Sequence, residues 1–256
     1  MLINVLIGLV TLYLVLCAAL FLSQRSMLYF PPPISNRRAS AQMTLQIGNE
    51  RILVSTRIID SSDAIIYLGG NAEDVSFNMP ELSSAFPGHA LYLLHYRGYG
   101  GSSGSPSEEA LFGDALALYD KVRAGHSRVV IIGRSLGSGI AVRLASVRDV
   151  AALVLVTPYD SIQDIAASHF AFFPVRWMLR DKYESWRYAP KVQAPTSIIA
   201  AELDEIIPRT STELLRTRFQ NGDVPFDVIP GAGHNSIAES GNYLPLLIRA
   251  VSIRRN

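Results

Sequence analysis

The sequence predicts an α/β protein with a mostly parallel, doubly wound sheet, preceded by a transmembrane helix at the N-terminus. Short runs of β-branched and aliphatic residues alternate with longer segments of helical periodicity. The later short runs are continuously apolar, as strands are when helices cover both faces of a parallel sheet. The expected strands cover residues 51–59, 64–68, 90–94, 129–132, 151–156, 196–200 and 225–229.

Composition and charge exclude several classes of protein. A hydrophobic fraction of 49% with 18% charged residues fits a folded domain and argues against disorder. The net charge of +1 creates no field that would attract nucleic acid, so no nucleic-acid partner is expected. Cys17 is the single cysteine, which excludes an intramolecular disulfide and a cysteine-ligated metal. Because it lies in an apolar stretch, it is not a candidate nucleophile.

The N-terminal stretch 2–22 carries no charged residue and is about 30 Å long as a helix, which is the thickness of a bilayer core. We expect a single-pass anchor at 1–24 and a juxtamembrane spacer at 25–40, in which Tyr29 and Phe30 make an interfacial contact. A cleaved signal peptide is the alternative, although no basic residue precedes the stretch. Positive residues follow it, which favours a cytoplasmic domain and leaves an exported one open.

The domain itself is expected at 41–256. Its clearest helix follows Ser105, which starts a capping box with Pro106 at the first helical position, and helical periodicity continues to Val122. The strand and helix alternation is interrupted at 161–188, where we expect a small helical insertion.

The strongest motif is Gly133-Arg134-Ser135-Leu136-Gly137, between an expected strand and an expected helix. A sharp strand-to-helix turn strains the backbone at Ser135 and exposes its hydroxyl, while side chains at Gly133 or Gly137 would clash with neighbouring elements. The following helix points its N-terminus at this position, so the backbone N–H of Leu136 is a candidate oxyanion donor. The pattern predicts a nucleophilic serine.

A nucleophilic serine needs a base and a carboxylate that orients the base. Of the five histidines, only His234 lies in a glycine-rich loop after a late strand. Asp204 follows the strand at 196–200 and is the preferred acid, with Glu202 and Glu205 as competitors. The chain order Ser135, Asp204, His234 is that of the α/β-hydrolase fold.

The sequence resembles the membrane-anchored α/β-hydrolases related to the fission-yeast bud-emergence protein homologue and to animal protein depalmitoylases. The resemblance covers nearly the whole chain after residue 24. Its motifs are Gly70-Asn71-Ala72-Glu73-Asp74, Tyr96-Arg97-Gly98-Tyr99-Gly100 with Ser102 and Pro106-Ser107-Glu108, the turn around Ser135, Thr157-Pro158-Tyr159-Asp160-Ser161, and Gly231-Ala232-Gly233-His234-Asn235.

The resemblance implies that the backbone N–H of Asn71 is the second oxyanion donor. The sequence departs from the family at Gly69, where a histidine is usual, and at His95, where an aspartate is usual. The loop that begins at Tyr96 is expected to be a structural brace rather than a chemical participant.

Together these features predict a serine hydrolase of esterase or thioesterase type, with no cofactor and no metal. The aromatic residues of the insertion either line an acyl pocket or pack onto the sheet, and with the anchor they favour an acylated or lipid-like substrate. A peptidase is the alternative, with a non-catalytic membrane scaffold as a third candidate. The sequence does not reveal the oligomeric state.

Overall fold

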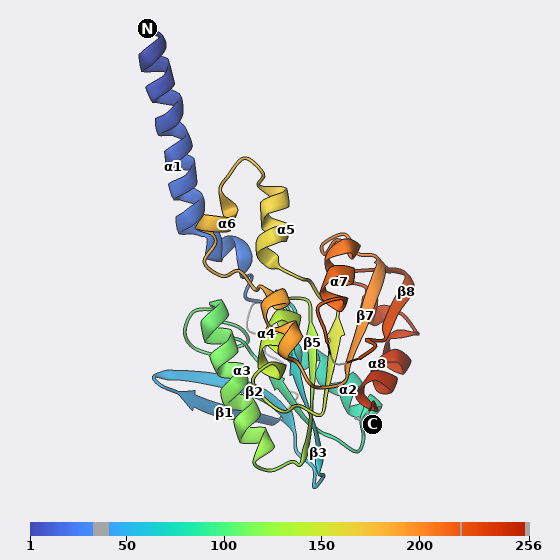
Figure 1. Ribbon diagram of the computed structural model, residues 1–256. Helices are drawn as coiled ribbons and strands as arrows, with labels where there is room; N and C mark the ends of the chain where they lie inside the picture. Colours follow the sequence, from blue (N-terminus) through green and yellow to red (C-terminus); the bar gives the residue numbers. More distant parts are fainter. Residues whose placement is uncertain (33–40, 221, 254–256) are drawn as a thin grey trace.

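The computed structural model describes residues 1–32, 41–220 and 222–253, and its centre is an eight-stranded sheet (Figure 1). The strand order is β1-β2-β4-β3-β5-β6-β7-β8. β2 is antiparallel to both of its neighbours, and all other pairs are parallel. The strands are β1 (Ala41–Ile47), β2 (Glu50–Arg57), β3 (Asp63–Leu68), β4 (Ala90–Leu94), β5 (Arg128–Arg134), β6 (Ala152–Val156), β7 (Thr196–Leu203) and β8 (Phe226–Gly233). The predicted fold class is confirmed.

Helices cover both faces of this sheet and bury its side chains in two separate clusters. Helices α3, α4 and α7 contribute to one cluster, and α2 and α8 to the other. The helices outside the insertion are α1 (Leu2–Leu28), α2 (Met79–Ala85), α3 (Glu108–Arg123), α4 (Leu136–Ala145), α7 (Arg209–Arg216) and α8 (Tyr243–Val251), with short 3-10 turns η1 (Val75–Asn78) and η4 (Ile237–Glu239).

Strand β5 shows why the central strands are continuously apolar. Ile131 lies in the cluster under α3 and α4, whereas its neighbours Val130 and Ile132 lie in the cluster under α2 and α8. Because successive side chains of a strand point to opposite faces, a strand covered on both sides has no polar position.

Two local features of the structure differ from the sequence-based description. Strand β1 was not predicted; it is an edge strand in which polar and apolar residues alternate. Helix α3 begins at Glu108, and its cap is Ser107, whose hydroxyl accepts from the Ala110 N–H at 3.2 Å, so the predicted cap at Ser105 is wrong. Glu108 does not complete a capping box, because its carboxylate accepts from the backbone N–H groups of Lys182 and Tyr183 in the insertion.

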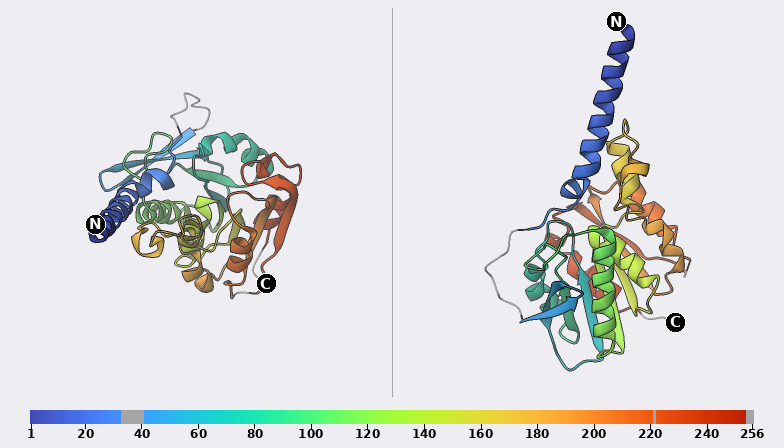
Figure 2. Two further views of the ribbon diagram at one scale, coloured as in Figure 1. Left: turned by 90° about the horizontal axis from the view of Figure 1, so that it is seen from above. Right: turned by 90° about the vertical axis from the view of Figure 1, so that its left-hand side faces the viewer.

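The insertion after β6 is helical, and it lies beside α1, which it contacts from Tyr13 to Arg25 (Figures 1 and 2). It contains α5 (Ile162–His169) and α6 (Val175–Met178), followed by the 3-10 turns η2 (Ser185–Arg187) and η3 (Ala189–Lys191). Its aromatic side chains differ in burial: Phe172 and Trp177 are each 90% exposed, whereas Tyr183 is buried in the cluster that includes α3 and α4.

Helix α1 projects away from the sheet as one continuous rod (Figure 2). Among the described residues it is the one helix long and apolar enough to cross a membrane. It extends to Leu28, into the segment expected as a spacer, of which residues 33–40 lie outside the described part. Tyr29 is buried, and its hydroxyl lies 2.8 Å from that of Tyr183, so it contacts the domain rather than an interface.

The loop that begins at Tyr96 is tied to α3 by a buried ion pair. Arg97 binds Asp114 through two hydrogen bonds of 2.8 Å, and the Asp114 side chain has no exposed surface. Arg148 binds Asp120 with the same two-bond geometry, but that pair is solvent-exposed. The two pairs therefore differ mainly in burial.

We expect Arg97→Ala to lower the free energy of unfolding by about 3 kcal/mol, because it leaves the Asp114 carboxylate buried without its partner. Arg148→Ala is the matched control and should cost less than about 1 kcal/mol. Thermal unfolding of the detergent-solubilised variants measures both. Equal losses of stability would show that burial of the Arg97 pair has no special role.

Candidate active site

The predicted site residues lie together at the carboxyl edge of the sheet. Ser135 directly follows β5, Asp204 follows β7 and His234 follows β8, while Asn71 lies in the loop after β3. Because these strands are parallel, residues from distant parts of the chain meet at one edge. This is where ligands bind in open α/β sheets.

The backbone at Ser135 is strained, and its surroundings hold it in place. Its φ is +48° and its ψ −117°, a conformation that side chains rarely adopt. The Ser135 N–H donates to the Val156 carbonyl at 2.9 Å. A Cβ added to Gly137 would lie 2.1 Å from the Leu68 carbonyl oxygen, and one added to Gly133 would lie 2.6 Å from Ala141 Cβ. Any side chain at position 133 or 137 would clash with these neighbours, so both positions require glycine.

Ser135, His234 and Asp204 form a continuous chain of hydrogen bonds. Ser135 Oγ lies 2.8 Å from His234 Nε2, and His234 Nδ1 lies 2.9 Å from each carboxylate oxygen of Asp204. The His234 side chain is buried, and that of Asp204 is nearly so. Such an arrangement can take the proton from the serine hydroxyl and stabilise the imidazolium that forms.

The three acidic candidates have distinct positions. Asp204 is the one that contacts the imidazole, and its carboxylate is fixed by the N–H groups of Ile206 and Ile207. Glu205 accepts from the backbone N–H of His234 at 3.0 Å, which holds the pKa of Glu205 below its usual value. Glu202 accepts from the Gly231 N–H. The competitors thus fix the loop that carries His234.

The loop after β3 packs directly against Ser135. A Cβ added to Gly70 would lie 3.6 Å from Ser135 Cβ, and the Gly69 carbonyl accepts from the Gly137 N–H at 3.1 Å. Leu136 is the first residue of α4, so its N–H has no acceptor within the helix. The two predicted oxyanion donors, Asn71 and Leu136, therefore belong to segments that flank the serine.

The side chain of Asn71 is fully engaged in holding its own loop. Its Nδ2 donates to the Leu28 carbonyl at 2.7 Å, and its Oδ1 accepts from the Tyr99 hydroxyl at 2.8 Å and from the Phe30 N–H at 3.1 Å. The Tyr96 hydroxyl donates to the Gly69 carbonyl in the same loop. The segment from Tyr96 thus braces the loop that bears Asn71, and α1 ends against it.

The structure shows what surrounds Gly69 and His95, the two residues that depart from the family pattern. A Cβ at Gly69 would lie 2.5 Å from Val75 Cγ1, so this chain has no room for the usual histidine. His95 is buried, its Nε2 lies 2.9 Å from Ser55 Oγ, and its ring fills the space above Gly100. A Cβ at Gly100 would lie 2.1 Å from His95 Nδ1.

Sequence reasoning missed two charged residues, Glu73 and Arg134, that lie next to the site. Glu73 accepts from the Gly70 N–H at 2.6 Å and from the Tyr67 hydroxyl at 2.7 Å. Arg134 lies 3.4 Å from Glu73 and points its other nitrogen at the His234 carbonyl, 3.5 Å away. Both residues belong to the glycine-rich motifs. The available signal was a charged residue at or just after the end of a buried strand: Arg134 ends β5, and Glu73 lies in the loop after β3.

Among the residues that the structure describes, no group of three or more His, Cys, Asp or Glu side chains is arranged to hold a metal ion.

Comparisons with known proteins agree with this architecture. Residues 63–184 match a family model described as the alpha/beta hydrolase fold. An uncharacterized protein of Mycobacterium tuberculosis is 35% identical over 232 residues, which cover 83% of this chain and 80% of that protein. The lysophosphatidylserine lipase ABHD12 of Macaca fascicularis is 31% identical over 185 residues, covering 63% of this chain but only 46% of the lipase.

Solved structures share the fold at low sequence identity. An esterase of Pyrococcus furiosus superposes with a TM-score of 0.69 at 18% identity, over 88% of this chain and 99% of the esterase. At this identity, the likeness bears on the fold alone.

We expect the stability of the protein to fall between pH 7.5 and 5.5 partly because of His95. Burial lowers the pKa of His95, although Asp74 nearby partly opposes this effect. Below the usual histidine pKa of about 6.5, the unfolded chain takes up a proton that folded His95 resists, which costs at most about 1.4 kcal/mol per pH unit.

His95→Asn removes this contribution, so its melting temperature should fall less than that of the wild type over the same pH range. Other titrating groups act equally in both proteins and cancel in the comparison. An identical fall in the two proteins would contradict the prediction.

Proposed function

Because this chain belongs to the alpha/beta hydrolase family, we propose that it is a serine esterase that cleaves a carboxylic ester or thioester of an acylated or lipid-like substrate. The single observation that carries the proposal is the 2.8 Å distance between Ser135 Oγ and His234 Nε2. A serine hydroxyl at this distance from an oriented imidazole is ready for general-base activation.

The proposed reaction proceeds through an acyl-enzyme. His234 takes the Ser135 proton while Ser135 Oγ attacks the carbonyl carbon, and the backbone N–H groups of Asn71 and Leu136 stabilise the oxyanion. His234 then gives the proton to the leaving alcohol or thiol. Water, activated by His234, releases the acid and restores Ser135. Asp204 orients the ring and stabilises its charged form.

The preference for an acylated substrate rests on α1 and the insertion. We propose that α1 contains a membrane anchor at 1–24, that 41–256 is the hydrolase domain, and that 161–188 forms a lid. An anchor would keep the site at the surface where acyl chains are found, and the relative with 31% identity is named a lysophosphatidylserine lipase. The positive residues that follow the anchor favour a cytoplasmic position for the domain.

The peptidase alternative gains no support from the contacts of its candidate residues. Glu202 and Glu205 already accept hydrogen bonds from backbone N–H groups, and Asp160 is paired with Arg218. None of the three is presented to a free amino group.

Ser135→Ala should abolish labelling by a fluorophosphonate probe and lower ester turnover by about 10⁶, because no other group can form the acyl-enzyme. Gel fluorescence of solubilised membranes measures the labelling. Ser146→Ala, the same change near the end of α4, is the matched control and should label like the wild type. Labelling that survives in Ser135→Ala would refute the assignment, and an unlabelled but folded wild type would favour a scaffold.

Asp204→Asn should lower kcat by about 10⁴, because the amide favours the wrong tautomer of His234. Glu202→Gln, which keeps a hydrogen-bond acceptor for Gly231, should change kcat only a few-fold. Both are measured with p-nitrophenyl esters. A loss in Glu202→Gln as large as that in Asp204→Asn would reassign the acid.

A further inference from the structure

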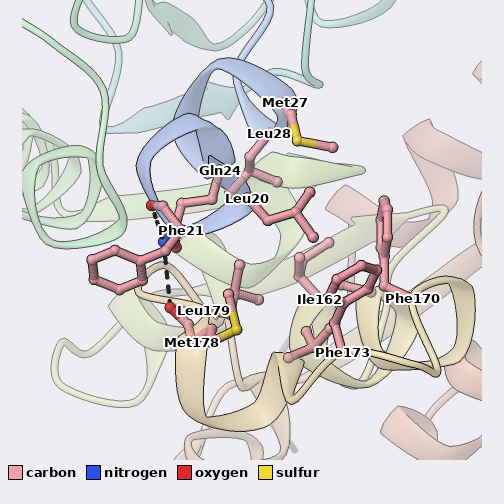
Figure 3. Close-up of a pocket in the computed structure, with 12 residues that line it drawn as sticks. Leu20, Phe21, Gln24, Met27, Leu28, Ile162, Phe170, Phe173, Met178 and Leu179 are labelled. Carbon is pink, nitrogen blue, oxygen red and sulfur yellow. Dashed lines mark hydrogen bonds between the residues drawn. The ribbon is translucent and has the colours of Figure 1, made fainter. Parts of the chain in front are cut away.

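A cleft of about 220 Å³ lies between α1 and the insertion (Figure 3). Its walls come from two elements distant in sequence and are almost entirely apolar. The residues used below are Leu20, Phe21 and Leu28 of α1, and Ile162, Ala166 and Phe170 of the insertion. An apolar cavity of about 150 Å³ already takes up a hydrocarbon ring in other proteins, so this cleft has the size for a hydrocarbon segment.

The one polar side chain in the wall is occupied. Gln24 Nε2 donates to the carbonyls of Phe21 and Met178, and its Oε1 accepts from the Arg180 N–H at 2.7 Å. A ligand in this cleft would therefore meet apolar atoms and no polar group that needs a partner. Hydrocarbon is the chemistry that fits.

Specific contacts hold the two walls of the cleft together. Tyr13 stacks on Phe173 with ring centroids 5.9 Å apart, and its hydroxyl donates to the Phe172 carbonyl at 3.0 Å. Near the other end of the contact, Arg25 pairs with Asp181 at 2.9 Å. These contacts at both ends fix the position of α1 relative to the insertion and therefore the shape of the cleft.

The position of these contacts along α1 fixes their depth if α1 spans a bilayer. Tyr13 lies twelve residues before Arg25, the first charged side chain along α1, which is about 18 Å along a helix. The hydrocarbon core is about 30 Å thick, so Phe172 and Phe173 would lie well inside it. Phe172 points outward with 90% of its surface exposed, as expected of a residue that faces lipid.

Leu28 links one side of the cleft to the loop that packs against Ser135. Leu28, which lines the cleft, has its carbonyl hydrogen-bonded to the side chain of Asn71, and the loop of Asn71 packs against Ser135. A chain lying in the cleft would therefore run from lipid depth toward the position where a carbonyl is attacked.

We propose that the cleft between α1 and the insertion binds one hydrocarbon chain of a membrane lipid, which enters sideways from the bilayer with its ester end toward Ser135. This inference rests on the proposed function for the anchor and the ester, and it adds that the anchor itself forms half of the acyl-chain site. The tip of the insertion, between α5 and α6, is embedded in the lipid together with α1.

The embedding is tested by fluorescence quenching in bilayers whose lipids carry bromine on the acyl chains. The chain has two tryptophans, Trp177 and Trp186, so Phe172→Trp in a Trp177→Phe, Trp186→Phe background gives a single reporter at the tip. Trp177→Phe alone leaves Trp186 as the control, because Trp186 lies in η2 at the base of the insertion, where its N–H donates to the Asp160 carbonyl. We expect strong quenching at position 172 and little at Trp186. Equal quenching at the two positions would overturn the embedding and with it the lateral route.

Occupancy of the cleft is tested by a matched pair on α5. Ala166→Phe fills the cleft, whereas Ala167→Phe makes the same change at the next residue, which lines a different surface hollow. Full-length Ser135→Ala protein in bilayers is photolabelled with a diazirine-bearing fatty acid. We expect labelling at α1 and α5 that Ala166→Phe reduces at least about tenfold and Ala167→Phe leaves unchanged. Equal labelling in the two variants would overturn the site.

The same pair in the active protein separates this inference from the proposed function. Ala166→Phe should lower the ratio of kcat/KM for dodecanoyl over butanoyl esters at least about tenfold, because methylene groups lose their apolar surroundings. An unchanged ratio would overturn the acyl-chain route. A wild type that hydrolyses no ester of any length, yet shows Ala166-dependent photolabelling, would refute the proposed function and leave the lipid site standing.

Discussion

Strand β3 and helix α4 approach each other so closely at Gly137 that even the methyl group of an alanine there would push them apart. A Cβ there would lie 2.1 Å from the Leu68 carbonyl and 2.6 Å from that of Gly69. This closeness lets the Gly137 N–H bond the loop after β3, so the loop and the turn at Ser135 form one unit. It also directs the N-terminus of α4 toward the space that the two segments share. The positive φ of Ser135 is maintained because its neighbours leave no relaxed alternative.

A buried polar network extends this unit to the loop of His234. Glu73 holds Gly70 on one side and lies beside Arg134 on the other, while Arg134 faces the His234 carbonyl. The side chains of Glu73 and Arg134 are both largely shielded from solvent, so their interaction is weakly screened. Side chains thereby link three loops that follow three different strands, in addition to the backbone hydrogen bond between Gly137 and Gly69.

Much of the sheet could be predicted from the sequence, because doubly covered strands such as β5 are short runs that are apolar between their ends. β1 escaped prediction because an edge strand with one solvated face shows only a weak alternation. The start of α3 was misplaced because Ser105 has the better local capping pattern, whereas the Glu108 carboxylate that would complete it binds the insertion instead.

The same distinction applies to the site. Ser135, Asp204 and His234 stand in motifs whose spacing is local, so their proximity could be anticipated from strand order. The roles of Glu73 and Arg134 depend on which loops meet, and the fit of Gly69 depends on Val75, a neighbour that no pattern reveals. Tyr29 was misjudged for a similar reason: its partner, Tyr183, is 154 residues away.

The attachment of α1 to the domain makes this helix part of the folded structure rather than a removable tether. Asn71 takes one hydrogen bond from Phe30 and gives another to Leu28, Asp181 relies on Arg25 for its ion pair, and Tyr183 on Tyr29 for its hydroxyl partner. A fragment that lacks the first thirty residues would leave these groups without their partners. Removal of α1 would thus alter the folded domain itself, including the loop that packs against Ser135.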